Sequence, residues 1–484
     1  MKGGNFIAYF LAGALPRLSM FVILFVLARQ ISIVETGLFV LVTTVGEILE
    51  MSTANWIRLF AQTREAGQQR LRPLRYGRLL VLALAGMGAA LLLVLPAALI
   101  VSPVRFWAFG LCVGLYVVAF AALRTVLVIQ QLTQNHTMFS RIELARGLLV
   151  LVSVLVAAYM PGATFVGPSV ALALSTLLVA LAGMWFARSR AHPPRFIARG
   201  YGTAGRYGAP IIADTVFGLV LMYFERFVLN QLLGPASVGV YAIAFALGRQ
   251  PVDFIAAPLN NLTVTVLFAT RAREGEERAR KVQTGVSISL FVLCAGALTG
   301  IFMLRTQFAE LFVKPEFRVD TALLMPIIAA SACVLVFKVF LYDNLFFMAG
   351  RNGLKLKAII PAAIGGAIGS VVLIKAYGLA GAAFSSLLAA VLALAASVIA
   401  TRTFFRFPMP FADLARISAV ALLSGLVLKG ATVLVQPLGT LAEVVAGCAL
   451  FCACYAFGLG VVGVSLRRLI STPWDPLADR KPRP

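Results

Sequence analysis

Long apolar runs, separated by short polar connections, recur along the whole chain. Each run approaches the roughly 20 residues that a helix needs to cross the hydrocarbon core of a bilayer. The runs are too long and too uniformly apolar for barrel strands, in which lipid-facing and lumen-facing residues alternate. The pattern therefore predicts an all-α polytopic membrane protein with about fourteen transmembrane helices. The predicted spans are approximately Phe6–Ala28, Gly37–Ala61, Leu79–Val101, Phe106–Gln130, Ile142–Tyr159, Phe165–Ala187, Ala209–Leu233, Val238–Thr270, Val282–Leu304, Leu323–Ala349, Ala358–Ala376, Leu379–Thr401, Leu414–Val435 and Leu441–Leu466.

The chain also contains an internal repeat. Residues 25–46, FVLARQISIVETGLFVLVTTVG, align without a gap with residues 227–248, FVLNQLLGPASVGVYAIAFALG, at an offset of 202 residues. A self-match at one long, fixed offset indicates two copies of a larger unit, a common construction among membrane transporters. The paired glycines Gly46 and Gly248 are interpreted as positions where two helices pack closely, not as ligand contacts.

The repeat extends further and defines the expected domains. Arg124 and Lys338 correspond at an offset of 214 residues, so spans one to six match spans seven to twelve. Because each copy has an even number of crossings, both should point the same way across the membrane. The expected organisation is an N-lobe (1–190), a basic cytoplasmic linker (191–207), a C-lobe (208–402), two extra helices (403–466) and a disordered cytoplasmic tail (467–484).

Charge refines this picture. Hydrophobic residues make up 61% of the 484 residues, charged residues only 13%, and the formal net charge is +23. Lys and Arg concentrate in alternate connections, which is a topology signal that places both termini in the cytoplasm and argues against nucleic-acid binding. All six cysteines lie within apolar runs and both histidines in polar connections, so we expect neither a metal site nor a cofactor.

Ionisable residues inside the spans are the candidate functional groups, because charge at membrane depth is costly. Candidate substrate-binding cations are Arg17, Arg58, Arg124, Arg226, Arg249 and Lys338. Candidate coupling or ion-pairing acids are Glu47, Glu50, Glu225, Asp253 and Asp343, with Asn55, Asn260 and Asn261 as polar cavity lining. If the first two helices of each half line a central cavity, these cations favour an anion, and guanidinium groups suit phosphate in particular.

Other interpretations of these residues remain open. Arg58 lies near the cytoplasmic end of its span, where it could extend to the membrane interface. Glu225–Arg226 and Arg249–Asp253 could be structural ion pairs that do not contact substrate. Arg17, beside Pro16, and Arg249 are the favoured contacts for an anionic substrate, because both lie deep in the membrane.

Three segments carry a resemblance to a known family: residues 224–248 (FERFVLNQLLGPASVGVYAIAFALG), 27–41 (LARQISIVETGLFVL) and 377–386 (YGLAGAAFSS). With these segments the chain resembles the polysaccharide transporter family of the multidrug/oligosaccharidyl-lipid/polysaccharide exporter superfamily, the O-antigen and exopolysaccharide flippases. The family often has an Asp-Arg pair in span seven, where this chain has Glu225-Arg226.

The resemblance implies a flippase, not an enzyme, that moves undecaprenyl-diphosphate-linked oligosaccharide across the bacterial inner membrane by alternating access. We also expect a monomer that contacts membrane lipids and polysaccharide polymerase or export machinery. A lipid II flippase and an ion-coupled multidrug exporter of the same superfamily are the alternatives. Glu47 and Glu50 keep the exporter open, because such exporters usually need an acid in the N-lobe. A membrane glycosyltransferase is disfavoured, because no outer loop is large enough for a catalytic domain.

Overall fold

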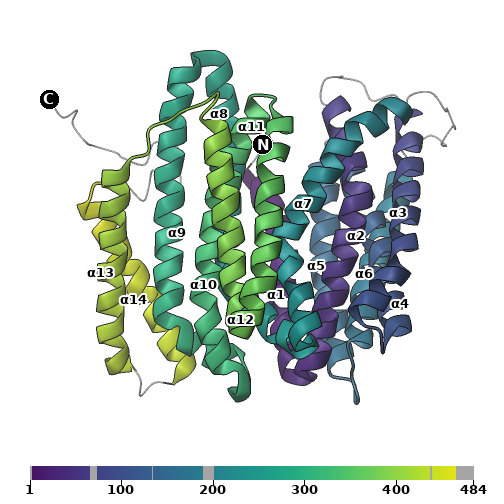
Figure 1. The fold of residues 1–484 in the computed structure, drawn as a ribbon, viewed down its shortest axis with the longest axis horizontal. Helices are drawn as coiled ribbons and strands as arrows, with labels where there is room; N and C mark the ends of the chain where they lie inside the picture. Colours follow the sequence, from purple (N-terminus) through teal and green to yellow (C-terminus); the bar gives the residue numbers. More distant parts are fainter. Residues whose placement is uncertain (1–2, 66–73, 133–134, 189–200, 436–438, 465–484) are drawn as a thin grey trace. The chain divides into compact units, whose positions relative to one another are not determined.

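The structure, a computed structural model, describes residues 3–65, 74–132, 135–188, 201–435 and 439–464. The described chain is built from helices that run roughly parallel to one another within each part of the molecule (Figure 1). The α-helices are α1 (Gly3–Gln30), α2 (Ile33–Glu65), α3 (Leu74–Val101), α4 (Phe106–Leu132), α5 (His136–Ala158), α6 (Val166–Arg188), α7 (Tyr201–Leu233), α8 (Pro235–Glu274), α9 (Glu276–Phe312), α10 (Arg318–Phe337), α11 (Asn344–Met348), α12 (Asn352–Thr401), α13 (Phe411–Val435) and α14 (Thr440–Val461). A 3-10 turn, Pro315–Phe317, precedes α10, and a π-helical segment, Lys338–Asp343, follows it.

Apolar composition identifies membrane-crossing helices among the described residues. Eight helical stretches are long and apolar enough to cross a bilayer: Ala83–Val101, Phe106–Gln131, Val166–Phe186, Glu276–Phe312, Pro315–Met348, Asn352–Thr401, Phe411–Ala431 and Thr440–Val461. The other long helices, α1, α2, α5, α7 and α8, do not meet that criterion over their described residues. Four of these, α1, α2, α7 and α8, are the first two helices of each sequence repeat, which carry most of the predicted site.

Contacts divide the chain into two units, Met1–Ala242 and Ile243–Pro484, with the division inside α8. In the first unit, α1 packs on α5, α4 and α5 pack on α6, and α2 contacts α3, α4 and α7. In the second unit, α10 packs between α9 and α12, while α13 and α14 pack on each other and on α9. Tyr455 of α14 donates a hydrogen bond to the Val292 carbonyl of α9 at 2.8 Å, which fastens the last two helices to the unit.

Two predicted spans correspond to one continuous stretch of helix, α12. Gly378 has a φ of 56° and a ψ of −130°, which turns the chain and divides α12 into two arms. The arms lie against each other, because a Cβ added to Gly381 would lie 2.0 Å from the Leu373 carbonyl oxygen. The arms are the predicted spans eleven and twelve, so the structure contains the fourteen long helices that the pattern predicts.

The repeat appears in the packing of its paired glycines. A Cβ on Gly37 would lie 1.9 Å from the Pro235 carbonyl oxygen, and one on Gly239 would lie 2.5 Å from the Ile33 carbonyl oxygen. The two contacts are equivalent in the repeat, because Gly37 corresponds to Gly239 and Ile33 corresponds to Pro235, each at an offset of 202 residues. The beginnings of α2 and α8 therefore meet through equivalent surfaces, and only glycine allows so close an approach.

Gly46 and Gly248 are close-packing positions, as predicted. A Cβ on Gly46 would lie 2.4 Å from the Tyr116 ring of α4, and one on Gly248 would lie 2.7 Å from the Met325 carbonyl oxygen of α10. One prediction needs refinement: α7 begins at Tyr201, so the end of the predicted linker is helical. The remainder of the linker and the tail 467–484 lie outside the described residues.

Candidate functional site

The first unit contains a buried charge network between α2 and α4. Glu50 is fully buried and accepts hydrogen bonds from two guanidinium groups, those of Arg58 on its own helix and Arg124 on α4. Arg124 also contacts Glu47, with 3.3 Å between Nη2 and Oε1. The network forms because Glu47, Glu50 and Arg58 occupy one face of α2, as their helical spacing predicts. Arg58 therefore points to Glu50 and is itself buried.

Asn55 completes the polar face of α2. Its Oδ1 atom accepts from Arg58 at 3.4 Å, and its Nδ2 atom donates to the Thr215 hydroxyl of α7 at 3.4 Å. The charges of this network cancel, because two guanidinium groups face two carboxylates. A buried charge that loses its partner is strongly unfavourable, so these groups hold one another in place.

The two acids of the network differ in exposure. The Glu50 side chain is 0% exposed, whereas that of Glu47 is 30% exposed and that of Arg124 is 23% exposed. The Arg124–Glu47 contact at 3.3 Å is also long for a charge-assisted hydrogen bond. Arg124 is thus anchored on one side by a buried acid and contacts a more exposed, exchangeable acid on the other.

Helix α7 brings its own polar residues to this network. Tyr223 donates to Glu47 Oε2 at 3.3 Å, and Arg226 donates to the Thr44 hydroxyl at 2.8 Å. The Arg226 guanidinium also lies 4.8 Å from the centre of the Tyr223 ring. Glu225 accepts a hydrogen bond from the Tyr241 hydroxyl at 3.2 Å. Glu225 therefore forms a hydrogen bond with α8, and the adjacent Arg226 forms one with α2.

Arg17 occupies a different environment. It is exposed on α1, next to Leu18, which is also exposed, whereas Ser19 is buried and donates to the Gly147 carbonyl of α5 at 2.9 Å. Within the part of the chain that the structure describes, Arg17 forms no hydrogen bond or ion pair. Arg17 is therefore on the face of α1 that does not pack on α5.

In the second unit, the predicted pair on α8 is present. Arg249 Nε lies 2.9 Å from Asp253 Oδ2, and the guanidinium lies 5.3 Å from the centre of the Phe245 ring. The Asp253 side chain is 42% exposed and that of Arg249 is 12% exposed. Further along α8, Asn260 accepts from Asn344 Nδ2 at 2.8 Å. The side chain of Asn261 lies outside the described set.

A second group of charges surrounds the π-helical segment. Lys338 Nζ donates to Asp343 Oδ2 at 2.7 Å, and Lys355 Nζ at the start of α12 lies 3.8 Å from the same oxygen. Residues five apart are out of line on an α-helix, but the i→i+5 hydrogen bonding of a π-helix brings them together. The predicted single helical span is therefore interrupted where its two charged residues meet.

The structure thus places the predicted residues in separate groups. Those of the first unit gather around Glu47 and Glu50, except Arg17 and Glu225, and those of the second unit form the Arg249 pair, the Asn260 contact and the Lys338 pair. The sequence interpretation missed Thr44, Tyr223 and Lys355. Thr44 lies one helical turn before Glu47, and this spacing could have identified it.

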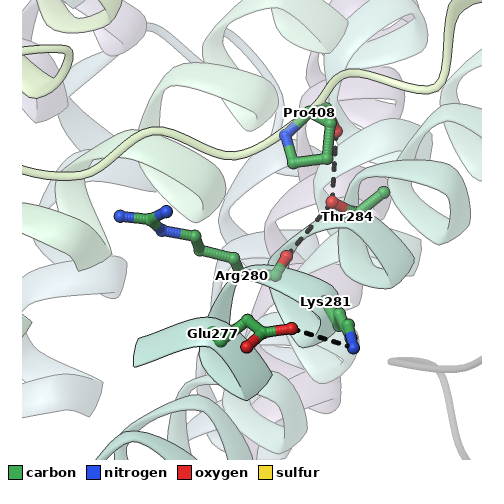
Figure 2. A pocket seen from close by; sticks show the side chains of 5 residues that line it. All are labelled: Glu277, Arg280, Lys281, Thr284 and Pro408. Carbon is green, nitrogen blue, oxygen red and sulfur yellow. Dashed lines mark hydrogen bonds and ion pairs between the residues drawn. The ribbon is translucent and has the colours of Figure 1, made fainter. Parts of the chain in front are cut away.

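A shallow pocket of about 330 Å³ lies at the beginning of α9, where the chain passes Pro408 (Figure 2). Its charged groups pair locally: Lys281 lies 3.2 Å from Glu277, and Arg280 lies 2.6 Å from Glu276. These side chains are largely exposed, so the pairs contribute little to stability. The pocket contains none of the predicted site residues. Among the described residues no cluster of His, Cys, Asp and Glu could hold a metal ion.

The chain is similar to known proteins both in sequence and in fold. A family profile described as "Polysaccharide biosynthesis protein" matches residues 3–268. A solved lipid II flippase in an inward closed conformation is similar, with a TM-score of 0.70, 11% identity, and coverage of 95% of this chain and 99% of the other. A eukaryotic MATE transporter has a TM-score of 0.57 and 15% identity, covering 86% of this chain and 99% of the other. No curated protein matches the chain. The likenesses show a transporter fold shared by lipid II flippases and MATE transporters.

Proposed function

This chain belongs to the polysaccharide biosynthesis protein family, and from that premise we propose that it is a flippase for an oligosaccharide linked to undecaprenyl diphosphate. It would move this lipid from the inner to the outer leaflet of a bacterial inner membrane, for export of O-antigen or exopolysaccharide. Alternating access of two repeat-related bundles would carry the hydrophilic head across, while the lipid tail stays in the bilayer. The similarity to solved transporter folds supports the flippase assignment.

One observation carries the proposal. Arg124 is anchored by the fully buried Glu50 and has a second, longer contact with the more exposed Glu47. An arriving diphosphate can take the place of Glu47, because a guanidinium group binds phosphate oxygens in a bidentate manner. The charge balance around Glu50 and Arg58 stays intact during this exchange. We therefore assign Arg124 as a contact of the diphosphate and Glu47 as its exchangeable partner.

Arg249 offers a similar exchange in the second unit, since its partner Asp253 is also the more exposed member of the pair. Arg17 is exposed and forms no ion pair with described residues, which suits a group that meets the substrate early. We propose both as further cationic contacts of the substrate. A Glu47 carboxylate displaced from Arg124 would be costly at membrane depth, so we propose that it takes up a proton and couples transport to a proton gradient.

The test is transport of lipid-linked oligosaccharide in proteoliposomes, measured as the fraction of glycan that becomes accessible to an external glycosidase. Arg124→Ala should lower the rate by at least about ten-fold, the effect of losing a charged hydrogen-bonded contact. Arg124→Lys should give an intermediate rate, because an ammonium group cannot form the bidentate contact. Arg278→Ala is the matched control, since the Arg278 side chain is 60% exposed in the charged first turns of α9.

Four outcomes would each contradict part of the proposal. A wild-type rate for Arg124→Ala would remove Arg124 from the substrate path. Faster transport of lipid II than of lipid-linked oligosaccharide would identify the protein as a flippase for cell-wall synthesis instead of glycan export. Transport of a cationic dye without either lipid would identify an exporter. A transport rate of Glu47→Gln that depends on pH as strongly as that of the wild type would contradict the coupling role of Glu47.

A further inference from the structure

Polar side chains of α2 and α7 meet in a regular antiparallel register. Arg226 donates to Thr44 at 2.8 Å, and Tyr223 donates to Glu47 at 3.3 Å. The step of three residues forward along α2 equals the step of three residues back along α7. Both side-chain contacts connect buried or half-buried groups, so water competes weakly with them.

The register continues to a third pair. Asn55 donates to Thr215 at 3.4 Å, and these residues lie eight positions beyond Glu47 and eight positions before Tyr223. We call the three hydrogen-bonded pairs the α2–α7 seam. Helices in a bilayer gain little from hydrophobic contact, and one interhelical hydrogen bond shifts an association equilibrium by about three-fold on average. The seam is therefore strong enough to hold α7 on α2 and weak enough to open.

Glu47 belongs both to this seam and to the Arg124 contact. Its Oε1 atom faces Arg124 and its Oε2 atom accepts from Tyr223, each at 3.3 Å. Glu50, one turn further along α2, accepts its side-chain hydrogen bonds from Arg58 and Arg124, and among the described residues it has no hydrogen bond to α7. Glu47 is the residue through which an event at Arg124 can reach the seam.

We propose that Glu47 is a latch that releases α7 from α2 when an anion of the phosphate class binds Arg124. The incoming anion repels the Glu47 carboxylate, because two negative groups cannot share one guanidinium group in a poorly screened site without cost. The carboxylate turns away from Arg124 and loses its bond to Tyr223. This inference rests on the proposed function only in taking Arg124 as the anion contact, and it adds Tyr223 as a positioning residue.

The chain contains a natural reporter of the seam. Trp56 of α2 packs on the beginning of α7, since a Cβ added to Gly208 would lie 2.5 Å from its ring. Trp107 and Trp185 are 73% and 70% exposed, and Trp474 lies outside the described residues. Replacing these three by phenylalanine leaves Trp56 as the single emitter in the full-length chain. Separation of α7 from α2 would expose the indole and shift its emission to longer wavelength.

The experiment titrates inorganic pyrophosphate into this single-tryptophan chain in nanodiscs of neutral lipid. We expect pyrophosphate to shift Trp56 emission to longer wavelength, and Arg124→Met to abolish the shift. Glu47→Leu, which removes the acceptor of the Tyr223 hydrogen bond, should shift the resting emission toward that of the pyrophosphate-bound protein and should respond no further to pyrophosphate. Tyr223→Phe should move the resting emission part of the way, since it removes one bond, which corresponds to about a three-fold change in the ratio of open to closed seams.

The matched controls are Tyr159→Phe, which removes an exposed hydroxyl, and Glu274→Gln, which removes a largely exposed acid. Both should respond to pyrophosphate like the wild type. A wild-type response of Glu47→Leu would overturn the latch, as would calorimetric binding of pyrophosphate without any change of Trp56 emission, or no binding at all. The emission assay uses no lipid-linked glycan, so the latch and the flippase assignment can fail separately.

Discussion

Arg124 and Lys338 occupy equivalent positions of the two repeats, yet their charges are balanced in different ways. Arg124 on α4 contacts two carboxylates, Glu47 and Glu50, that are both supplied by α2. Lys338 is paired with Asp343, which lies five residues further along the same chain segment and is brought within reach by the π-helical turn. In one unit the charges join two long helices, whereas in the other the closest pair is local.

The sequence explains this difference. The residues 202 positions after Glu47 and Glu50 are Arg249 and Val252, so the second repeat lacks both acids that neutralise Arg124. The close-packing glycines, in contrast, are retained at both positions. Both copies of the repeat therefore keep the glycines that allow helices to pack closely, but they differ in their charged residues.

The largest expected effect follows from Glu50. Glu50→Leu leaves the Arg58 and Arg124 guanidinium groups without their shared buried partner, which should cost about 3–5 kcal/mol of the free energy of unfolding. The corresponding change in the second repeat, Val252→Leu, should cost less, about 1–3 kcal/mol, because it adds one methylene group at a buried position and leaves no charge unpaired. Equilibrium unfolding of the purified protein in mixed micelles measures both values.

A triple variant tests whether charge is the cause. Glu50→Leu combined with Arg58→Met and Arg124→Met removes the whole buried network, and stability should return to near the wild-type value. If the triple variant is as unstable as Glu50→Leu alone, packing around Glu50 is responsible and the proposed difference between the two repeats is wrong.

The number and type of the helices could be predicted from the sequence, because long apolar runs and a self-match at fixed offset depend on composition and spacing alone. The beginning of α7 at Tyr201 could not, since its first turns are polar and resemble a connection. The π-helical segment at Lys338 was also unpredictable. Hydropathy does not distinguish i→i+4 from i→i+5 hydrogen bonding.

The candidate site could be predicted only in part. Helical spacing placed Glu47, Glu50 and Arg58 on one face of α2, and the structure joins two of these directly. Helical spacing shows which residues share a face of α2, but it does not show which helix packs against that face. It therefore could not show that Arg124 of α4 completes the network. Tyr223 was missed because it is uncharged, and Lys355 because the basic stretch around it was interpreted as a connection.

A smaller effect separates another repeat-related pair of glycines, Gly167 and Gly381, which are 214 residues apart. A Cβ on Gly381 would lie 2.0 Å from the Leu373 carbonyl oxygen, whereas one on Gly167 would lie 3.8 Å from its nearest neighbours. Gly381→Ala should therefore destabilise the protein by about 1–3 kcal/mol, and Gly167→Ala by less than about 0.5 kcal/mol. Thermal unfolding followed by circular dichroism compares the two. Equal loss in both variants would show that the second repeat is not packed more tightly there.

The smallest effect is a coupling between Gly37 and Gly239, a repeat-related pair of glycines that lie at one contact between α2 and α8. An added methyl group at either glycine forces the beginnings of α2 and α8 apart, because each would meet a backbone oxygen of the other helix. Once the helices have separated, the second methyl group finds room. We therefore expect each single Gly→Ala change to cost about 1 kcal/mol and the double variant to cost little more than one of them, a coupling energy of about 1 kcal/mol.

Gly88→Ala, with nothing within 4 Å of its added Cβ, is the control and should combine additively with either. Additive losses in the Gly37→Ala, Gly239→Ala double variant would mean that the two contacts form independently, and that the symmetric approach of α2 and α8 is not a single cooperative interface.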